Sequence, residues 1–341
     1  MQNYQQIPTK AKCPVCTCND AHRLWDVTSK QAAQHYVLQE KQPERYLELV
    51  SHIEDLWKQD SCEVVKCDQC EFCYSNPYVA GDKRFYYLAY ERPGYPSWKW
   101  EFQITHDILS DIFKTNFKML EIGAGDGSFV ERVVDKLTPK DNIFCTEFSE
   151  TGRDKISKLG VNCSSEHVRN LSNQDLKESL DAICMFQVLE HMDEIDLLFQ
   201  KLNWLLKKNG SLFISVPNAS RVVFNELNGA LLDMPPNHIG RWNKVCFEYI
   251  GKRYGFEIKN HKVEPSSFLA MVKQFVSYRF LKRSQQSGSF ENYVQSIKNK
   301  NFLRIGQVVG VALNFMMAIP AFIKKDFQQG DSQWVHLIKI R

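Results

Sequence analysis

The feature that most constrains the fold is an apolar run that breaks into glycines and then resumes with a helical pattern. Residues 117–129 read FKMLEIGAGDGSF. We expect a buried strand over Lys118 to Ile122, a tight turn, and a helix that Ser128 helps to start and that continues through FVERVVDKL. A strand, a glycine turn and a helix in this order are typical of an α/β domain that binds a ligand at the turn.

The turn carries acids as well as glycines. Its pattern is E-x-G-x-G-x-G, with Glu121 and Asp126 around Gly123, Gly125 and Gly127. Carboxylates would repel a pyrophosphate, so this is not the usual phosphate-binding loop. They suit a cation, or a ligand that presents hydroxyl and amino groups, and glycine lets that ligand approach the backbone closely.

Strands and helices alternate after this turn. NIFCTEF is a second strand with Glu147 near its end, LGVNCSS a third, and LDAICMFQVLEHMDE a fourth with its loop. LFQKLNWLLKKNGSLFISVPN predicts a helix, a stop at Gly210 and a fifth strand. A helix ending at Gly255 and a sixth strand follow, and residues 334–340 alternate as a last strand. This order predicts a doubly wound, largely parallel α/β sheet.

Two cysteine pairs precede this domain. Cys13 and Cys16 stand in CPVC, and Cys67 and Cys70 in CDQC. Two such knuckles form a tetrahedral thiolate site for structural Zn²⁺, which leaves no position open for water. The intervening residues 28–60 have apolar residues at helical spacing and predict an inserted helical segment. Three further cysteines in this region, Cys18, Cys62 and Cys73, leave the ligand set open.

Four motifs together resemble a known family. LEIGAGDGSF, Glu147, FQVLEHMDE and LLKKNGSLFISVPN look like the successive motifs of class I S-adenosylmethionine-dependent methyltransferases, over about residues 95–263. The nearest subgroup contains ubiquinone-biosynthesis-type and sugar methyltransferases, and some of its members begin with a CxxC…CxxC unit. The long insert between the two cysteine pairs departs from the compact form of that unit.

The resemblance implies a Rossmann-like seven-stranded methyltransferase sheet and S-adenosylmethionine as cofactor. It divides the chain into a zinc unit with helical insert (1–90), the cofactor-binding domain (91–263), a helical insertion or lid (264–333) and the last strand (334–341). SSEHVRN, after the third strand, lacks the expected acidic adenine signature. The implied cofactor contacts are Glu121, Gly123, Gly125 and Gly127 at the methionine part, Glu147 at the ribose and Gln187 near the sulfonium.

Methyl transfer needs a base only when the acceptor must lose a proton. His191, just past the fourth strand, and His238, on the loop after the fifth, are the catalytic candidates because both lie on the carboxyl-end rim of the sheet. His191 has an alternative role as a structural hydrogen-bonding residue in its loop. Tyr90 and Tyr95 precede the first helix of the domain, where they contact ligand or pack against the protein.

Charge is uneven along the chain. The formal net charge is +3, but Lys244 to Lys325 contains 14 Lys and Arg against 4 Glu and no Asp. This bias favours an anionic small-molecule acceptor, a membrane surface or an acidic partner. Residues 305–323 form an apolar stretch of spanning length that Gln307, Asn314 and Pro320 interrupt. We expect it to pack as a lid or to lie in a membrane interface, not to cross a bilayer.

The combined prediction is a methyltransferase acting on a small molecule, for example a sugar or a phosphorylated glycan precursor. One alternative is an RNA methyltransferase that uses the zinc unit to bind RNA, but FQVL stands where an amino-methylation tetrad would be. Another is a non-catalytic cofactor-binding scaffold. The N-terminal residues MQNYQQIPTK lack an apolar signal core, and with eleven cysteines they predict a cytoplasmic location, with peripheral membrane contact as an option. Oligomeric state is not indicated.

Overall fold

The computed structural model describes residues 7–90, 98–112, 116–134, 136–172, 174–222, 234–284, 288–297, 299–322 and 329–341. Internal contacts divide the chain into two compact units. The larger unit comprises Tyr4–Pro217, Met234–Lys262 and Gln333–Arg341, and the smaller unit comprises Met1–Asn3, Asn218–Asp233 and Val263–Ser332.

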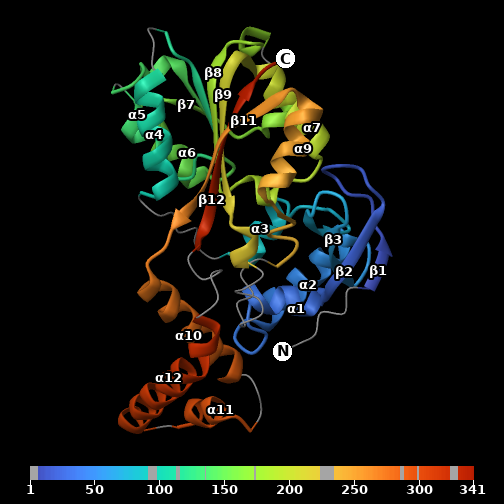
Figure 1. Cartoon of the computed structure of the whole chain (residues 1–341), viewed down its shortest axis with the longest axis vertical. Helices are drawn as coiled ribbons and strands as arrows, with labels where there is room; N and C mark the ends of the chain where they lie inside the picture. Colours follow the sequence, from blue (N-terminus) through green and yellow to red (C-terminus); the bar gives the residue numbers. More distant parts are fainter. Residues whose placement is uncertain are drawn as a thin grey trace. The chain divides into compact units, whose positions relative to one another are not determined.

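A seven-stranded sheet is the centre of the larger unit (Figure 1), in the order β11-β12-β9-β8-β5-β6-β7. The five strands from β5 to β9 pair in parallel. The last strand lies between β9 and β11, and Ile340 N donates to Gly255 O at the start of β11, so β12 runs antiparallel to β11. The predicted doubly wound sheet is confirmed. Its strands are β5 Met119–Ile122, β6 Ile143–Thr146, β7 Asn162–Ser164, β8 Leu180–Phe186, β9 Leu206–Pro217, β11 Phe256–Pro265 and β12 Gln329–Lys339.

Apolar side chains cover both faces of this sheet. Successive strand residues point to opposite faces, so Met119 joins one buried cluster with Phe129 and Phe186, whereas Leu120 joins another with Trp242. Helices cover these faces: α4 Trp100–Ile112, α5 Val130–Val133, α6 Glu150–Ser157, α7 Ile195–Leu205 and α9 Lys244–Tyr254.

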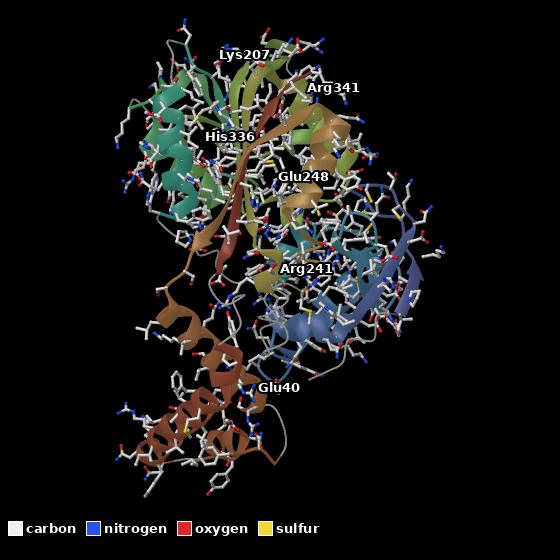
Figure 2. All side chains as sticks on the ribbon, viewed as in Figure 1. Glu40, Lys207, Arg241, Glu248, His336 and Arg341 are labelled. Carbon is white, nitrogen blue, oxygen red and sulfur yellow. The ribbon has the colours of Figure 1, made fainter. Side chains whose placement is uncertain are left out.

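His336 shows how completely the sheet is covered (Figure 2). It lies on β12 with 2% of its surface exposed. Its ring stacks on Phe213 with centroids 4.3 Å apart, and Nε2 lies 3.0 Å from Ser211 Oγ. Burial, and secondarily the charge of Lys259, lower the pKa of His336 to about 4. The imidazole is therefore neutral near pH 7 and belongs to the core.

Two local predictions are wrong. The helix expected through FVERVVDKL is one turn long, because the backbone is already extended at Val134, and Ser128 does not cap it: its hydroxyl donates to Asp126 Oδ1. Gly210 does not end a helix. Helix α7 ends at Leu205, and Gly210 lies within β9, where a Cβ would come within 2.9 Å of Lys207 O. The register of β9 against β8 shifts between Leu206 and Ser211, so Gly210 lies where the strand pairing is irregular and a side chain would meet the backbone.

The N-terminal region forms a second sheet in the order β1-β2-β3-β4-β10, in which every pair is antiparallel. Helices lie in the predicted insert between β2 and β3, and Thr28 begins the first of them with a capping box. They pack around a buried cluster that includes Leu49, Ile53 and Trp57. The elements are β1 Ile7–Lys10, β2 Asp20–Thr28, α1 Ser29–Tyr36, α2 Pro43–Trp57, β3 Ser61–Cys67, β4 Cys73–Asn76, α3 Lys83–Ala89 and β10 Gly240–Arg241.

The smaller unit contains the helical insertion predicted before the last strand. Its helices are α10 Phe268–Ser284, α11 Phe290–Gln295 and α12 Lys300–Phe322. Each of the three contacts the other two. Across the described residues, no helix combines the length and the apolar character needed to span a bilayer.

Candidate active site

The glycine loop follows β5, the strand at which the direction of the sheet order reverses. Gly123, Gly125 and Gly127 have φ angles of +69°, +58° and +81°, a region that favours glycine. A Cβ on Gly123 would lie 2.6 Å from Val188 Cγ2, and one on Gly127 would lie 2.9 Å from Ile156 Cγ1. The fold therefore requires bare backbone at both of these positions.

Glu147 closes the loop from the end of β6. Its Oε2 accepts a hydrogen bond from Gly125 N at 2.9 Å, and its Oε1 accepts one from Ser149 N at 2.7 Å. Burial raises the pKa of Glu147, while these two backbone donors oppose the rise. Each carboxylate oxygen retains acceptor capacity, so the side chain can also accept hydrogen bonds from a vicinal diol.

Glu121 lies deeper, on β5 itself. It is 2% exposed and stands in register between Cys145 and Cys184 of the neighbouring strands. Its Oε2 has no hydrogen-bond partner among the described residues. Burial, followed by nearby acidic groups, raises the pKa of Glu121 well above its usual value. A buried carboxyl with one unsatisfied oxygen fits a cationic group such as the α-ammonium of S-adenosylmethionine.

Asp126, the second acid of the loop, is engaged differently. Its carboxylate accepts from Ser128 Oγ at 2.7 Å and from Lys155 Nζ at 3.3 Å. Partial burial raises the pKa of Asp126, but the hydrogen bonds from Ser128 and Lys155 and the lysine charge lower it by more, so the pKa is below its usual value. Because Lys155 already compensates its charge, we do not count Asp126 among the candidate cofactor contacts.

Two aromatic residues beside Glu147, Phe148 and His167, are not marked by any motif of the sequence. Phe148 directly follows it and is 55% exposed. The His167 ring lies 5.9 Å from the Phe148 ring, centroid to centroid. Burial and then Arg169 lower the pKa of His167 to about 4, so this ring is neutral near pH 7. An exposed phenyl ring next to a neutral imidazole suits a planar heterocycle. The feature that marks Phe148 as a candidate contact is its high exposure in the structure.

Gln187 ends β8 with a φ of +57°, a conformation that is uncommon outside glycine and often found at functional positions. Its Nε2 lies 3.3 Å from Glu101 Oε1 and 3.4 Å from Ser215 Oγ. Glu101 comes from α4 and is 2% exposed, with Lys99 Nζ 4.0 Å away. Sequence reasoning also missed Glu101, because nothing local marks it as a partner of a residue 86 positions later.

The two candidate histidines lie together. Their ring centroids are 4.6 Å apart at an interplanar angle of 76°. His191 Nδ1 lies 2.8 Å from Asn237 O and 3.2 Å from Tyr86 Oη. A carbonyl only accepts, so Nδ1 carries the hydrogen and Nε2 is the basic nitrogen of His191. The structural hydrogen bond weighed for His191 is present, and it also orients the ring. Tyr86 is an additional residue of this group.

Glu190 completes a set of three candidate metal ligands with the histidines. One carboxylate oxygen of Glu190 and one nitrogen each of His191 and His238 lie within 4.8 Å of one another. Glu190 is 1% exposed. Imidazole and carboxylate together suit a divalent cation.

Of the two tyrosines predicted to contact ligand or to pack, Tyr90 lies with its ring centroid 6.3 Å from that of Tyr86. Tyr95 lies outside the described residues.

The four cysteines of the two knuckles also come together. Cys13 Sγ lies 3.5 Å from Cys70 Sγ, Cys16 Sγ lies 3.4 Å from Cys67 Sγ, and all four sulfurs are within 4.8 Å of one another. In a tetrahedral zinc site with bonds of about 2.3 Å, neighbouring sulfurs are about 3.8 Å apart. The cluster therefore fits a closed Zn²⁺ site, and its members are the four predicted residues.

The loop that bears His238 is attached to the N-terminal sheet. Strand β10 follows His238 and pairs with β4, which follows the second knuckle. Ser75 N donates to Ile239 O and Gly81 N donates to Pro236 O, both at 2.9 Å. The second knuckle also contacts helix α9, because Cys246 Sγ donates to Cys70 O at 3.6 Å. The cysteine cluster and the histidine pair are thus linked through β4 and β10.

The strand order and the glycine loop at its switch point define a doubly wound α/β domain with a ligand loop at the carboxyl ends of its strands. Residues 98–261 match the family model described as a methyltransferase domain. This match, which covers slightly less than half of the chain, agrees with the motifs read from the sequence.

Two curated relatives each match about a third of the chain or less. The mitochondrial ubiquinone biosynthesis O-methyltransferase of Dictyostelium discoideum is 26% identical over 112 residues, which are 29% of this chain and 35% of the relative. The ubiquinone biosynthesis O-methyltransferase of Pelagibacter ubique is 31% identical over 110 residues, or 30% of this chain and 43% of the relative. The chain therefore spans less than half the length of either relative.

Solved structures are similar only at a distance. A SAM-dependent methyltransferase from Archaeoglobus fulgidus is 14% identical with a TM-score of 0.44, covering 70% of this chain and 92% of that one. The phosphoethanolamine N-methyltransferase 2 of Haemonchus contortus, in complex with S-adenosyl-L-methionine, is 14% identical with a TM-score of 0.42, covering 71% and 53%. Likenesses of this size say nothing about the acceptor of this chain.

Proposed function

We propose that the protein is an S-adenosylmethionine-dependent methyltransferase that acts on a small-molecule acceptor. The observation that carries the proposal is the buried Glu121, whose Oε2 is unsatisfied among the described residues. It lies directly before the positive-φ glycine loop that Glu147 closes. This arrangement offers one place for a cationic amino group and another for a ribose diol, on neighbouring strand ends.

S-adenosylmethionine, when bound, supplies an already activated methyl group from its sulfonium. Glu121 compensates the α-ammonium, and Glu147 accepts hydrogen bonds from the ribose hydroxyls. Phe148 and His167 stack on the adenine. Gln187, held by Glu101 and Ser215, lies at the end of β8 and faces the reacting end of the donor. The chain's own contribution is alignment and exclusion of water.

On the acceptor side, His191 is the proton acceptor. Asn237 O holds the hydrogen on Nδ1, so Nε2 receives the proton that the acceptor group loses as the methyl group arrives. Tyr86 is a positioning residue, because its hydroxyl contacts His191 and not the reacting atoms. His238, with its ring against that of His191, contacts the acceptor.

The accepting atom is proposed to be a hydroxyl oxygen. Both relatives reported above bear names of ubiquinone-biosynthesis O-methyltransferases, and a hydroxyl is a group that must lose a proton on methylation. The excess of Lys and Arg beyond Lys244 favours an anionic acceptor. We therefore propose two classes of acceptor. One is the sugar or phosphorylated glycan precursor predicted from the sequence, and the other is an anionic hydroxylated ring.

We also propose that Cys13, Cys16, Cys67 and Cys70 hold one structural Zn²⁺. The sulfur spacing, and the all-thiol composition of the cluster among the residues that the structure describes, support this assignment over a catalytic metal. The metal would fix the second knuckle and, through β4 and β10, the loop of His238.

The test is a labelling assay with methyl-labelled S-adenosylmethionine and two acceptor sets, phosphorylated sugars and anionic hydroxylated aromatics. We expect labelled product from one set with the full chain, and at least a 100-fold lower rate with His191→Gln. Donor binding without product from any acceptor in cell extract would contradict the enzymatic proposal and favour a binding scaffold. Product of equal yield from His191→Gln would remove the proposed base.

A further inference from the structure

Helix α12 of the smaller unit has an unusual distribution of polar and apolar side chains. Helices α10, α11 and α12 form one group (Figure 1). Its interior contains apolar side chains of α10 and α11, such as Phe275 and Val294, together with the polar Glu291 and Asn314, whereas the apolar side chains of α12 are exposed. A helix that packs in water places its apolar stripe inward and its polar residues outward. Helix α12 departs from this arrangement, so we ask what covers its exposed apolar side chains.

Its interior contains a hydrogen-bonded polar cluster. Asn314 is 0% exposed and Glu291 is 2% exposed. Asn314 Nδ2 donates to Glu291 Oε1 at 2.6 Å and to Gly310 O at 2.8 Å. Arg283 Nε donates to Glu291 Oε2 at 2.9 Å. The one acid of this segment is thereby compensated inside the unit, so it adds no negative charge to the surface.

The seam of α12 consists of Gly306, Gly310 and Asn314, which are four residues apart and share one face. A Cβ on Gly306 would lie 2.9 Å from Val294 Cγ2, and one on Gly310 would lie 2.5 Å from Phe280 Cε2. Close approach of helices through small residues, joined by side-chain hydrogen bonds, is the way helices associate in lipid. In that environment apolar side chains provide no driving force between helices.

Most of the remaining surface of α12 is apolar and exposed. Ile305 and Val308 have 60% and 69% of their surface exposed. Scattered apolar residues are normal on a protein surface, but a continuous apolar helix surface marks an interaction site. The exposed apolar side chains of α12 are Phe302, Ile305, Val308, Val309, Val311, Leu313, Phe315 and Met316, and Leu269 and Tyr293 add to them.

Charge indicates which kind of surface covers these residues. Between residues 268 and 322 the sequence has seven Lys and Arg and one acid, Glu291. Lys300 and Arg304, in the first turns of α12, are exposed beside Phe302. Basic residues at the end of an apolar helix complement an anionic phospholipid surface.

We propose that residues 268–322 bind an anionic phospholipid bilayer, with α12 lying in the interface. Its apolar side chains enter the acyl region, and Lys300 and Arg304 contact headgroups. Strand β11 leads into this segment and β12, its neighbour in the sheet, leads out. Both ends of the segment are thus on one side of the bilayer. This proposal does not depend on the proposed methyl transfer.

The test is flotation of the full chain with vesicles of equal parts phosphatidylglycerol and phosphatidylcholine, and with phosphatidylcholine alone. We expect binding to the anionic vesicles. The double variant Ile305→Glu/Val308→Glu should reduce partitioning at least about tenfold, since both apolar side chains lose their burial in the acyl region. The control Leu47→Glu/Leu197→Glu changes two exposed side chains of α2 and α7, 60% and 52% exposed, and should bind as the unchanged chain does.

A second variant isolates the charge. Lys300→Gln/Arg304→Gln should remove most of the preference for anionic vesicles. Circular dichroism and donor-product binding should be the same for all variants, which shows that the fold persists. Failure of the unchanged chain to float, or equal flotation of Ile305→Glu/Val308→Glu, overturns the proposal. So does a dimer in solution that this double variant separates, because the apolar surface would then be occupied by a second copy.

Discussion

The donor side of the site and its acceptor side are built in different ways. The two acids of the donor side and the glycine loop lie within residues 121–147, on strands β5 and β6 that pair directly, and Gly125 N donates to the Glu147 carboxylate. The acceptor side joins Tyr86 to His191 across 105 positions and His191 to Asn237 across 46. The donor side is therefore formed by residues close in sequence. The acceptor side forms only when the N-terminal sheet pairs with β10.

This difference teaches where each side is vulnerable. Disturbing the N-terminal sheet should damage the acceptor side and leave donor binding largely intact. Disturbing the glycine loop or Glu147 should do the reverse. Four predictions test that separation.

The largest effect is expected from loss of the proposed zinc. Structural zinc contributes on the order of 10 kcal/mol to the folding of small units. Cys67→Ser/Cys70→Ser should therefore lose the metal and nearly all turnover, while affinity for S-adenosylhomocysteine changes less than about threefold. Elemental analysis, initial rates and calorimetry measure these quantities. Cys18→Ser, a half-exposed cysteine outside the cluster, should keep the metal. A parallel collapse of donor binding in the double variant would show that the two sides are not separable.

The next effect concerns the proposed base. His191→Gln should lower kcat by about 10²- to 10⁴-fold, the usual contribution of a general base. Affinity for S-adenosylhomocysteine should not change, because no donor-side contact involves this residue. Tyr86→Phe removes the hydroxyl oxygen that shares the Nδ1 hydrogen of His191 with Asn237 O, and this should cost about 1 kcal/mol, or roughly fivefold. His22→Gln on β2 is the matched control, and a drop in its kcat equal to that of His191→Gln would refute the assignment.

Glu147→Ala should act on the other side. It removes the acceptor of two backbone donors and the proposed partner of the ribose diol. Hydrogen bonds to charged groups contribute about 1.5–3 kcal/mol each, so we expect S-adenosylhomocysteine to bind about 100-fold more weakly by calorimetry. The carboxylate of Asp126 is paired with Lys155, and Asp126→Asn should change affinity less than about threefold. Equal losses in both variants would contradict the special role of Glu147.

The smallest effect is a stability change with a defined pH dependence. Burial raises the folded-state pKa of Glu121 above that of the unfolded chain, so the folded state favours the neutral acid. Stability from this group is complete below about pH 4.5 and is lost as pH rises through the folded pKa. Glu121→Gln should therefore stabilise the ligand-free protein at pH 8 by about 1 kcal/mol, and not at pH 4, while donor affinity falls. Denaturant unfolding at both pH values measures this, and a variant less stable at pH 8 would disagree with the assignment.

The sequence was informative where structure is local. The glycine turn, the alternation of strands and helices along the chain and the four cysteines of the cluster were all predicted. Gly210 was misread, because a glycine after a helical pattern also occurs where strand pairing is irregular, and β9 already begins at Leu206. Glu101, Tyr86 and the pairing of β10 with β4 could not be predicted. Each depends on which distant segments pack together, and no local pattern encodes that.

The most direct measurement for the central claim is a calorimetric titration of the full chain with S-adenosylhomocysteine. The account predicts saturable binding at one site per chain, strongly weakened in Glu147→Ala and preserved in His191→Gln. Folded protein that gives no saturable heat, or a Glu147→Ala variant that binds as tightly as the unchanged chain, would contradict it.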